Sequence, residues 1–72
     1  MIKVGQVYQT ERLEIVLITR VVGFHFYIIT PSGMTGEFNN IFKDVWSYWK
    51  LIAEYPTWQE AVNSKEFKVG VK

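Results

Sequence analysis

The chain has one histidine and no cysteine, so few of its side chains could carry metal or nucleophilic chemistry. A metal site or His-dependent catalysis would need carboxylates converging on His25, and the spacing of acidic residues indicates no such cluster. His25 lies in an apolar run that alternates as a strand does. We therefore interpret it as a surface or rim imidazole, and we predict no catalytic residue, no metal and no cofactor.

The acidic side chains are seven and stand singly along the chain. They are Glu11, Glu14, Glu37, Asp44, Glu54, Glu60 and Glu66. Paired acid and base work requires two carboxylates in one cleft, and a domain of this size usually lacks the depth. Nucleophile elbows and phosphate-binding glycine loops are missing as well, since Gly33 and Gly36 have no Lys-Ser/Thr after them. We predict that the protein is not an enzyme.

Aromatic residues make up 17% of the chain and are the better indication of a function. Most of their rings can be buried in a core, yet exposed aromatic patches on small domains bind proline rings, extended peptides or bases. Trp46 and Tyr48 are the first candidates, because a short turn before the last strand should project side chains outward. Tyr8, at the exit of the first strand, is the third. We expect this patch to contact a protein partner.

Nucleic-acid binding is the alternative function, with Arg12, Arg20, Lys43 and Lys50 meeting phosphates while aromatic rings stack on bases. The net charge is only +1, and the basic side chains are scattered. A nucleic-acid surface normally concentrates Lys and Arg in a stripe. The charge pattern therefore favours a protein partner over a nucleic acid.

The length of 72 residues allows one small domain, because chains this short bury only about 60% of the surface that unfolding exposes. The apolar content of 49% suits a packed core, and the lack of cysteine rules out disulfides. The most apolar window, residues 15–29, is interrupted by Arg20, Gly23 and His25 and is too short to span a bilayer. With no apparent signal peptide, we expect a soluble, cytoplasmic protein.

Four strands are predicted from alternation and β-branched content, over residues 5–8, 13–22, 24–30 and 35–38. The second is apolar on both faces, with Ile15, Leu17 and Val21 on one and Val16, Ile18 and Val22 on the other. Such a strand is either central to a layered sheet or bent between two sheets, and the shortness of the chain favours the bent barrel strand. Gly23 indicates a tight reversal, and residues 30–33 fit a type I turn.

Residues 39–55 allow two interpretations. In one, Asn39 or Asn40 caps a helical turn or two, and a last strand follows at about residues 49–54. In the other, a single helix runs over residues 41–55 and ends before Pro56. That helix would be apolar on nearly every face, and four short strands could not cover it. We favour the turn and strand.

A C-terminal helix is predicted over residues 57–67. Thr57 and Glu60 have capping-box spacing, so the Thr57 hydroxyl should accept a hydrogen bond from the Glu60 N–H. Trp58, Ala61 and Val62 form its apolar stripe, Asn63 and Ser64 weaken it, and Phe67 should reach the core. Residues 68–72 should form a frayed end or an added edge strand.

This order of elements resembles an SH3-like small barrel of about five antiparallel strands with a helical turn before the last strand. The single domain would then comprise residues 1–72, with the barrel over 5–54 and the helix over 57–67. Residues 48–67 in particular are similar to small proteins carried by phages and prophages of Gram-positive bacteria. The resemblance implies a mainly β fold, a bacterial cytoplasm and a phage or host partner, and leaves the oligomeric state open. The region Phe24-His25-Phe26 departs from the peptide groove of SH3 domains, which puts polyproline binding in doubt.

Overall fold

A computed structural model describes residues 2–39, 41 and 46–68 and shows a mainly β protein. Five strands precede two short helices. The strands are β1 (Gln6–Gln9), β2 (Ile15–Val22), β3 (His25–Ile29), β4 (Thr35–Asn39) and β5 (Lys50–Glu54), and the helices are α1 (Trp58–Val62) and α2 (Lys65–Lys68). No helix in the described ranges is long and apolar enough to cross a membrane.

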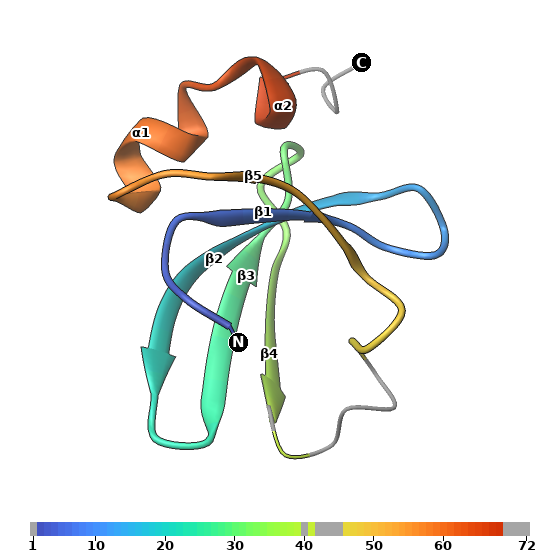
Figure 1. Cartoon of the computed structure of the whole chain (residues 1–72), viewed down its shortest axis with the longest axis vertical. Helices are drawn as coiled ribbons and strands as arrows, with labels where there is room; N and C mark the ends of the chain where they lie inside the picture. Colours follow the sequence, from blue (N-terminus) through green and yellow to red (C-terminus); the bar gives the residue numbers. More distant parts are fainter. Residues whose placement is uncertain (1, 40, 42–45, 69–72) are drawn as a thin grey trace.

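All five strands belong to one antiparallel sheet with the order β4-β3-β2-β1-β5. In Figure 1, β1 and β5 run across the view while β3 and β4 run down it, so the sheet curves strongly between its two edges. The segment before β1 is tied to both neighbouring strands. The Gly5 N–H donates to the Ile18 carbonyl at 2.9 Å, and the Gly5 carbonyl accepts from the Tyr55 N–H at 3.0 Å.

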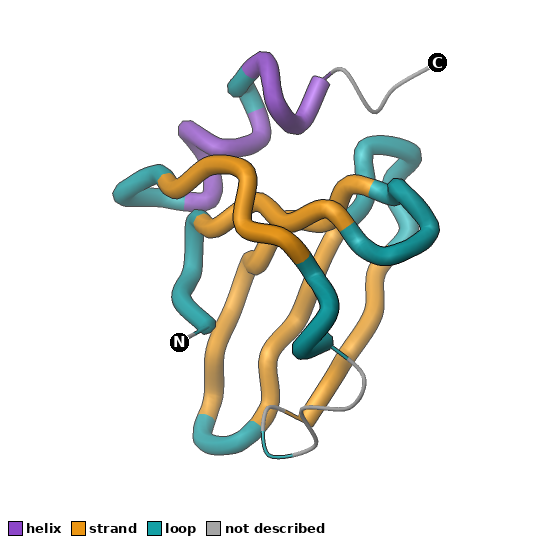
Figure 2. The backbone as a smooth tube through the Cα atoms, turned by 45° about the vertical axis from the view of Figure 1, so that its right-hand side comes forward, coloured by secondary structure: helices purple, strands orange, loops and turns teal. Residues whose placement is uncertain are grey.

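Strand β2 is buried on both faces over residues 15–18 and separates two groups of core residues. Val16 and Ile18 face a cluster that also contains Ile2, Tyr8, Phe26 and Ile28. Ile15 and Leu17 face the helices, where Ala61 and Phe67 complete a second cluster. The helices above β1 and β5 in Figure 2 thus cover one face of the central strand. Short C-terminal helices therefore cover β2 in a chain whose length we expected to favour a bent barrel strand.

The far half of β2 departs from the predicted faces because the pairing with β3 shifts. Ile18 pairs with Ile28 and Arg20 pairs with Tyr27, so Thr19 is an extra residue in β2. An extra residue reverses the alternation that follows it. Val21 accordingly packs with the Val16 and Ile18 side, and Val22 is exposed. The predicted grouping of Val21 with Leu17, and of Val22 with Ile18, was wrong.

The segment before β5 follows the predicted turn and strand. Residues 46–48 form a turn closed by a hydrogen bond from the Trp49 N–H to the Trp46 carbonyl at 3.0 Å, and β5 follows at once. Asn39 accepts a bond from the Ile41 N–H at 2.9 Å, while residues 40 and 42–45 lie outside the described part of the chain. One helix over residues 41–55 is excluded, because a strand occupies residues 50–54.

The predicted C-terminal helix is present as two short helices. The Thr57 hydroxyl accepts from the Glu60 N–H at 3.2 Å, which confirms the cap. Asn63 and Ser64 separate α1 from α2, at the position where the sequence weakens the helix. Phe67 is buried against the core as expected. The interpretations of residues 69–72 fall outside the described residues.

Candidate binding groove

The loop between β1 and β2 is organised by the side chain of Thr10. Its hydroxyl accepts hydrogen bonds from the N–H groups of Arg12 and Glu14, at 3.3 and 3.2 Å. The Thr10 N–H donates to the Glu14 carbonyl at 2.8 Å, and the Leu13 N–H donates to the Thr10 carbonyl at 2.9 Å. Leu13 adopts a φ of 66° and its side chain is 75% exposed. This loop holds an apolar residue in the left-handed region, which is uncommon for leucine.

The turn between β3 and β4 repeats three of these four hydrogen bonds around Thr30. The Thr30 N–H donates to the Met34 carbonyl at 2.8 Å, and the Gly33 N–H donates to the Thr30 carbonyl at 2.9 Å. The Thr30 hydroxyl accepts from the Met34 N–H at 3.1 Å. Gly33 has a φ of 93°, as the third residue of such a loop requires. Pro31 to Gly33 was the part of this motif visible in the sequence.

A groove of about 500 Å³ lies between these two loops. Its floor is apolar and is formed by residues of the cluster around Phe26 and by residues that pack against that cluster. The floor residues are Val16, Ile28, Gly36, Phe38 and Trp49. The rim is polar or charged apart from Met34, and consists of Thr10, Glu11, Arg12, Glu14, Thr30, Met34 and Thr35. An apolar floor with a few polar groups at its mouth is the usual composition of a binding site.

Aromatic rings pack on one another beneath the floor of the groove. The Phe38 ring meets the Trp49 ring edge to face, with 5.3 Å between their centroids. Phe26, fully buried, stacks on Phe38 at 5.5 Å and meets Trp49 at 6.1 Å. Such pairs add stability beyond the area they bury. The groove is therefore formed on a packed wall of rings.

Gly36 keeps the groove open where β4 crosses it. A Cβ atom at this position would lie 3.3 Å from the Phe38 ring and 3.4 Å from the Ile28 side chain. Gly36 is not among the positive-φ residues, so its backbone does not need glycine. A glycine inside a strand often marks the place where a ligand or another backbone approaches closely.

The three predicted contact residues differ in their surroundings. Tyr48 is 73% exposed, as expected. Trp46 is half-buried instead, with its ring 6.1 Å from that of Phe26, and its Nε1 has no hydrogen-bond partner among the described residues. Tyr8 is buried in the core, and its hydroxyl donates to Gln6 at 2.8 Å. Burial, and then the charge of Glu54, raise the pKa of Tyr8.

The described basic residues proposed for nucleic acid come from different parts of the sheet. Arg12 lies on the groove rim, Arg20 stands over the ring of Tyr27 at 5.8 Å, and Lys50 opens β5. Arg12 precedes β2, and Arg20 lies near the far end of that strand. Lys43 lies outside the described residues.

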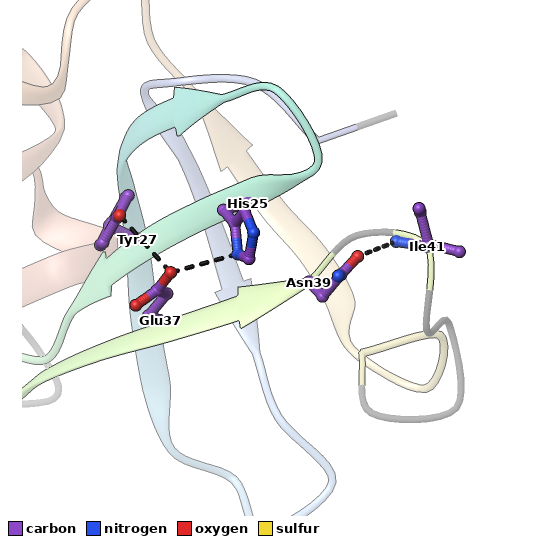
Figure 3. A network of polar contacts seen from close by, with 5 residues as sticks. All are labelled: His25, Tyr27, Glu37, Asn39 and Ile41. Carbon is purple, nitrogen blue, oxygen red and sulfur yellow. Dashed lines mark hydrogen bonds and ion pairs between the residues drawn. The ribbon is translucent and has the colours of Figure 1, made fainter.

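His25 makes a surface contact, as the sequence indicated. Figure 3 shows its Nδ1 beside Glu37 across β3 and β4, at 3.1 Å, with the Tyr27 hydroxyl also directed to that carboxylate. Both partners of the pair are about half exposed. The described residues contain no group of three potential metal-ligating His, Cys, Asp or Glu side chains.

A tyrosine joins the end of the sheet to α2. The Tyr55 hydroxyl donates a hydrogen bond to the Glu66 carboxylate. This bond raises the pKa of Tyr55 and lowers the pKa of Glu66, since it favours the neutral phenol and the charged carboxylate. The hydrogen bond connects α2 to the end of the sheet, on the side opposite the rings of Phe26, Phe38 and Trp49.

Sequence reasoning missed most of the groove, because its floor residues were assigned to the core alone. Val16 and Ile28 are core residues by every pattern, and only their position beside Gly36 makes them a floor. The available signal was Gly36 itself, a glycine in a predicted strand. The repeated threonine before each loop, Thr10 and Thr30, was a second one.

Comparison of the chain with protein-family models, with curated proteins and with solved structures finds no match.

Proposed function

We propose that this chain is a non-enzymatic binding module that holds an extended segment of a protein partner in its groove. The groove is the observation that carries the proposal, because an apolar floor and a polar rim suit the side chains of an extended peptide. The aromatic contact surface then consists of Phe38 and Trp49 on the floor and the exposed Tyr48 next to Trp49. Trp46 and Tyr8 support this surface from the core.

We also propose that the chain has an SH3-like barrel fold and comes from a phage or prophage. The strand order β4-β3-β2-β1-β5 is the order expected for an SH3-like small barrel, and this supports assigning the chain to that class. An origin in a phage or prophage rests on the resemblance of residues 48–67. The partner is then a phage or host protein in the bacterial cytoplasm.

The test is a selection followed by mapping. A random peptide library displayed on phage is selected against the full chain, and the selected peptide is titrated into ¹⁵N-labelled protein. We expect chemical-shift changes at the amides of Thr35, Gly36 and Phe38 and at the Trp49 indole. The amides of α1 should not move. Failure to select any peptide, or shifts confined to the helices, would contradict the proposal.

Two variants distinguish a residue that contacts the peptide from one that stabilises the fold. Tyr48→Ala should weaken peptide binding with little change in thermal midpoint, because this side chain is exposed. Trp46→Ala should lower the midpoint, because it removes a ring packed on Phe26. The nucleic-acid alternative replaces the proposal if a single-stranded oligonucleotide at low salt produces salt-sensitive shifts around Arg12, Arg20 and Lys50 while peptides produce none.

A further inference from the structure

We propose that the partner segment binds as an added strand along β4, with one apolar side chain in the groove and a basic side chain between Glu11 and Glu14. This inference rests on the proposed function and adds to it the mode of recognition and the chemistry of the ligand. It is carried by the open edge of β4, the glycine in its centre and the charges on the rim.

Strand β4 is a sheet edge with no strand paired to its outer side among the described residues. It stands last in the strand order, and it pairs with β3 in unbroken register from Thr35 opposite Ile29 to Asn39 opposite His25. Natural edge strands are usually protected by lysine, proline or a bulge. The residues of β4, Thr-Gly-Glu-Phe-Asn, include neither lysine nor proline, and the register contains no bulge.

The opposite edge is protected in ways that β4 is not. Strand β5 begins with Lys50, and its pairing with β1 shifts between Val7 and Tyr8, so that Ile52 is an extra residue. A bulge bends an edge and interrupts the row of groups that a new strand would use. Of the two edges, only β4 offers five regular residues to an added strand.

The groove lies where side chains of a strand on β4 would point. Thr35, Gly36 and Phe38 line it from β4, and the β1–β2 loop closes its other side. Residues at i and i+2 of a strand share a face, so an added strand would direct every second side chain toward the groove. The groove, about 500 Å³ in volume, has room for one aliphatic side chain against Val16 and Ile28.

The rim determines the charge of the ligand. Glu11, Glu14 and Arg12 are exposed side chains of the groove, which leaves one net negative charge at its mouth. No ion pair joins these three in the part of the chain that the structure describes. A Lys or Arg in the partner, near its apolar residue, would complement this charge.

The occupant is a different polypeptide and not a second copy of this chain. An antiparallel pair of β4 strands that matches all five residues is centred on Glu37. It would place the two Glu37 side chains directly opposite each other, and like charges in that position are destabilising. A partner strand with an uncharged or basic residue at that place meets no such repulsion.

The first test distinguishes strand addition from peptide binding in general. The selected peptide is resynthesised in two forms, each with every second amide N-methylated. One form should lose at least about tenfold in affinity, because strand addition uses alternate N–H groups of the ligand, and the other should bind nearly as well as the parent. Equal affinity of all three peptides overturns strand addition and leaves the proposed function standing.

The second test fills the groove in steps. Gly36→Ala should weaken binding a little, and Gly36→Val should weaken it at least about tenfold, because each added group occupies the position of the ligand's apolar side chain. A Cβ at this position already lies 3.3 Å from the Phe38 ring, so the fold of both variants is first checked from their amide spectra. Undiminished binding by a folded Gly36→Val variant overturns the proposed position of that side chain.

The third test concerns charge. Glu11→Lys combined with Glu14→Lys should slow association of a basic peptide severalfold and invert its salt dependence. Glu60→Lys, on exposed α1, is the control and should leave the association rate unchanged. Unchanged kinetics of the rim variant overturn the basic ligand. Concentration-dependent dimers that Gly36→Val abolishes would assign β4 to a second copy instead.

Discussion

The loop at residues 10–14 and the turn at residues 30–34 share three hydrogen bonds and differ in the residue that adopts a positive φ. Both begin with a threonine whose hydroxyl accepts a hydrogen bond from the N–H four residues later, at 3.2 and 3.1 Å. Both have a positive φ at the residue three positions after the threonine. That residue is Gly33 in one and Leu13 in the other. The shape of the loop therefore depends on threonine and the closing bonds more than on glycine.

The comparison also indicates where the chain tolerates strain. A non-glycine residue in the left-handed region costs about 1–2 kcal/mol. Gly33 avoids this cost, whereas Leu13 does not, and its exposed side chain gains little burial in return. Residues with strained backbone conformations cluster at functional sites. Leu13 at one loop tip and the exposed Met34 at the other agree with the groove between them being a contact site.

The largest expected effect comes from another glycine at positive φ, Gly5, which lies outside the two loops. Gly5 has the same φ of 93° as Gly33, but a Cβ at Gly5 would lie 2.1 Å from the Tyr55 carbonyl oxygen. Gly5→Ala should cost about 3 kcal/mol, since strain and overlap add. Gly33→Ala has open space and is the control. Equal losses in urea unfolding would show that overlap contributes nothing.

Exchanging the two residues between the loops should change the free energy of unfolding less, and with opposite signs for the two variants. Gly33→Leu should destabilise the fold by about 1 kcal/mol, because it introduces the left-handed strain. Leu13→Gly should stabilise it by about 0.5 kcal/mol, because relief of strain exceeds the entropy that glycine loses on folding. Thermal unfolding of both variants measures the difference. A destabilised Leu13→Gly variant would mean that the leucine side chain makes contacts worth more than its strain.

The last comparison concerns the two threonines. Thr10→Val and Thr30→Val each remove a hydroxyl acceptor while keeping the side-chain shape, and each should cost about 0.5–1 kcal/mol. Thr10 should be the more sensitive, because its hydroxyl accepts two backbone N–H groups and holds a strained residue. Thr→Ser at the same positions serves as the control that restores the acceptor. A larger loss at Thr30 would reverse the order of the two loops.

Local signals predicted the elements well where each depends on its own residues. The strands fall within a residue or two of their expected positions, the Thr57 cap is confirmed, and the break at Asn63-Ser64 lies where weak helix formers stand. The burial of Val21 and Val22 could not be predicted, because the extra residue Thr19 appears only when β2 is set against β3. The same holds for Tyr8, whose ring packs against Trp49, a residue separated from it in the chain by β2, β3 and β4.

The sequence by itself determined the strands, the turns with proline or glycine, the capped helix and the absence of disulfides, since these depend on residue type and on neighbours along the chain. Tertiary structure decided which face each side chain occupies beyond the bulge, that helices cover one face of β2, and that Thr10 and Thr30 flank a common groove. The physical reason is that burial and cavities arise from packing between segments distant in the chain. The spacing of residue types within one segment therefore does not predict that packing.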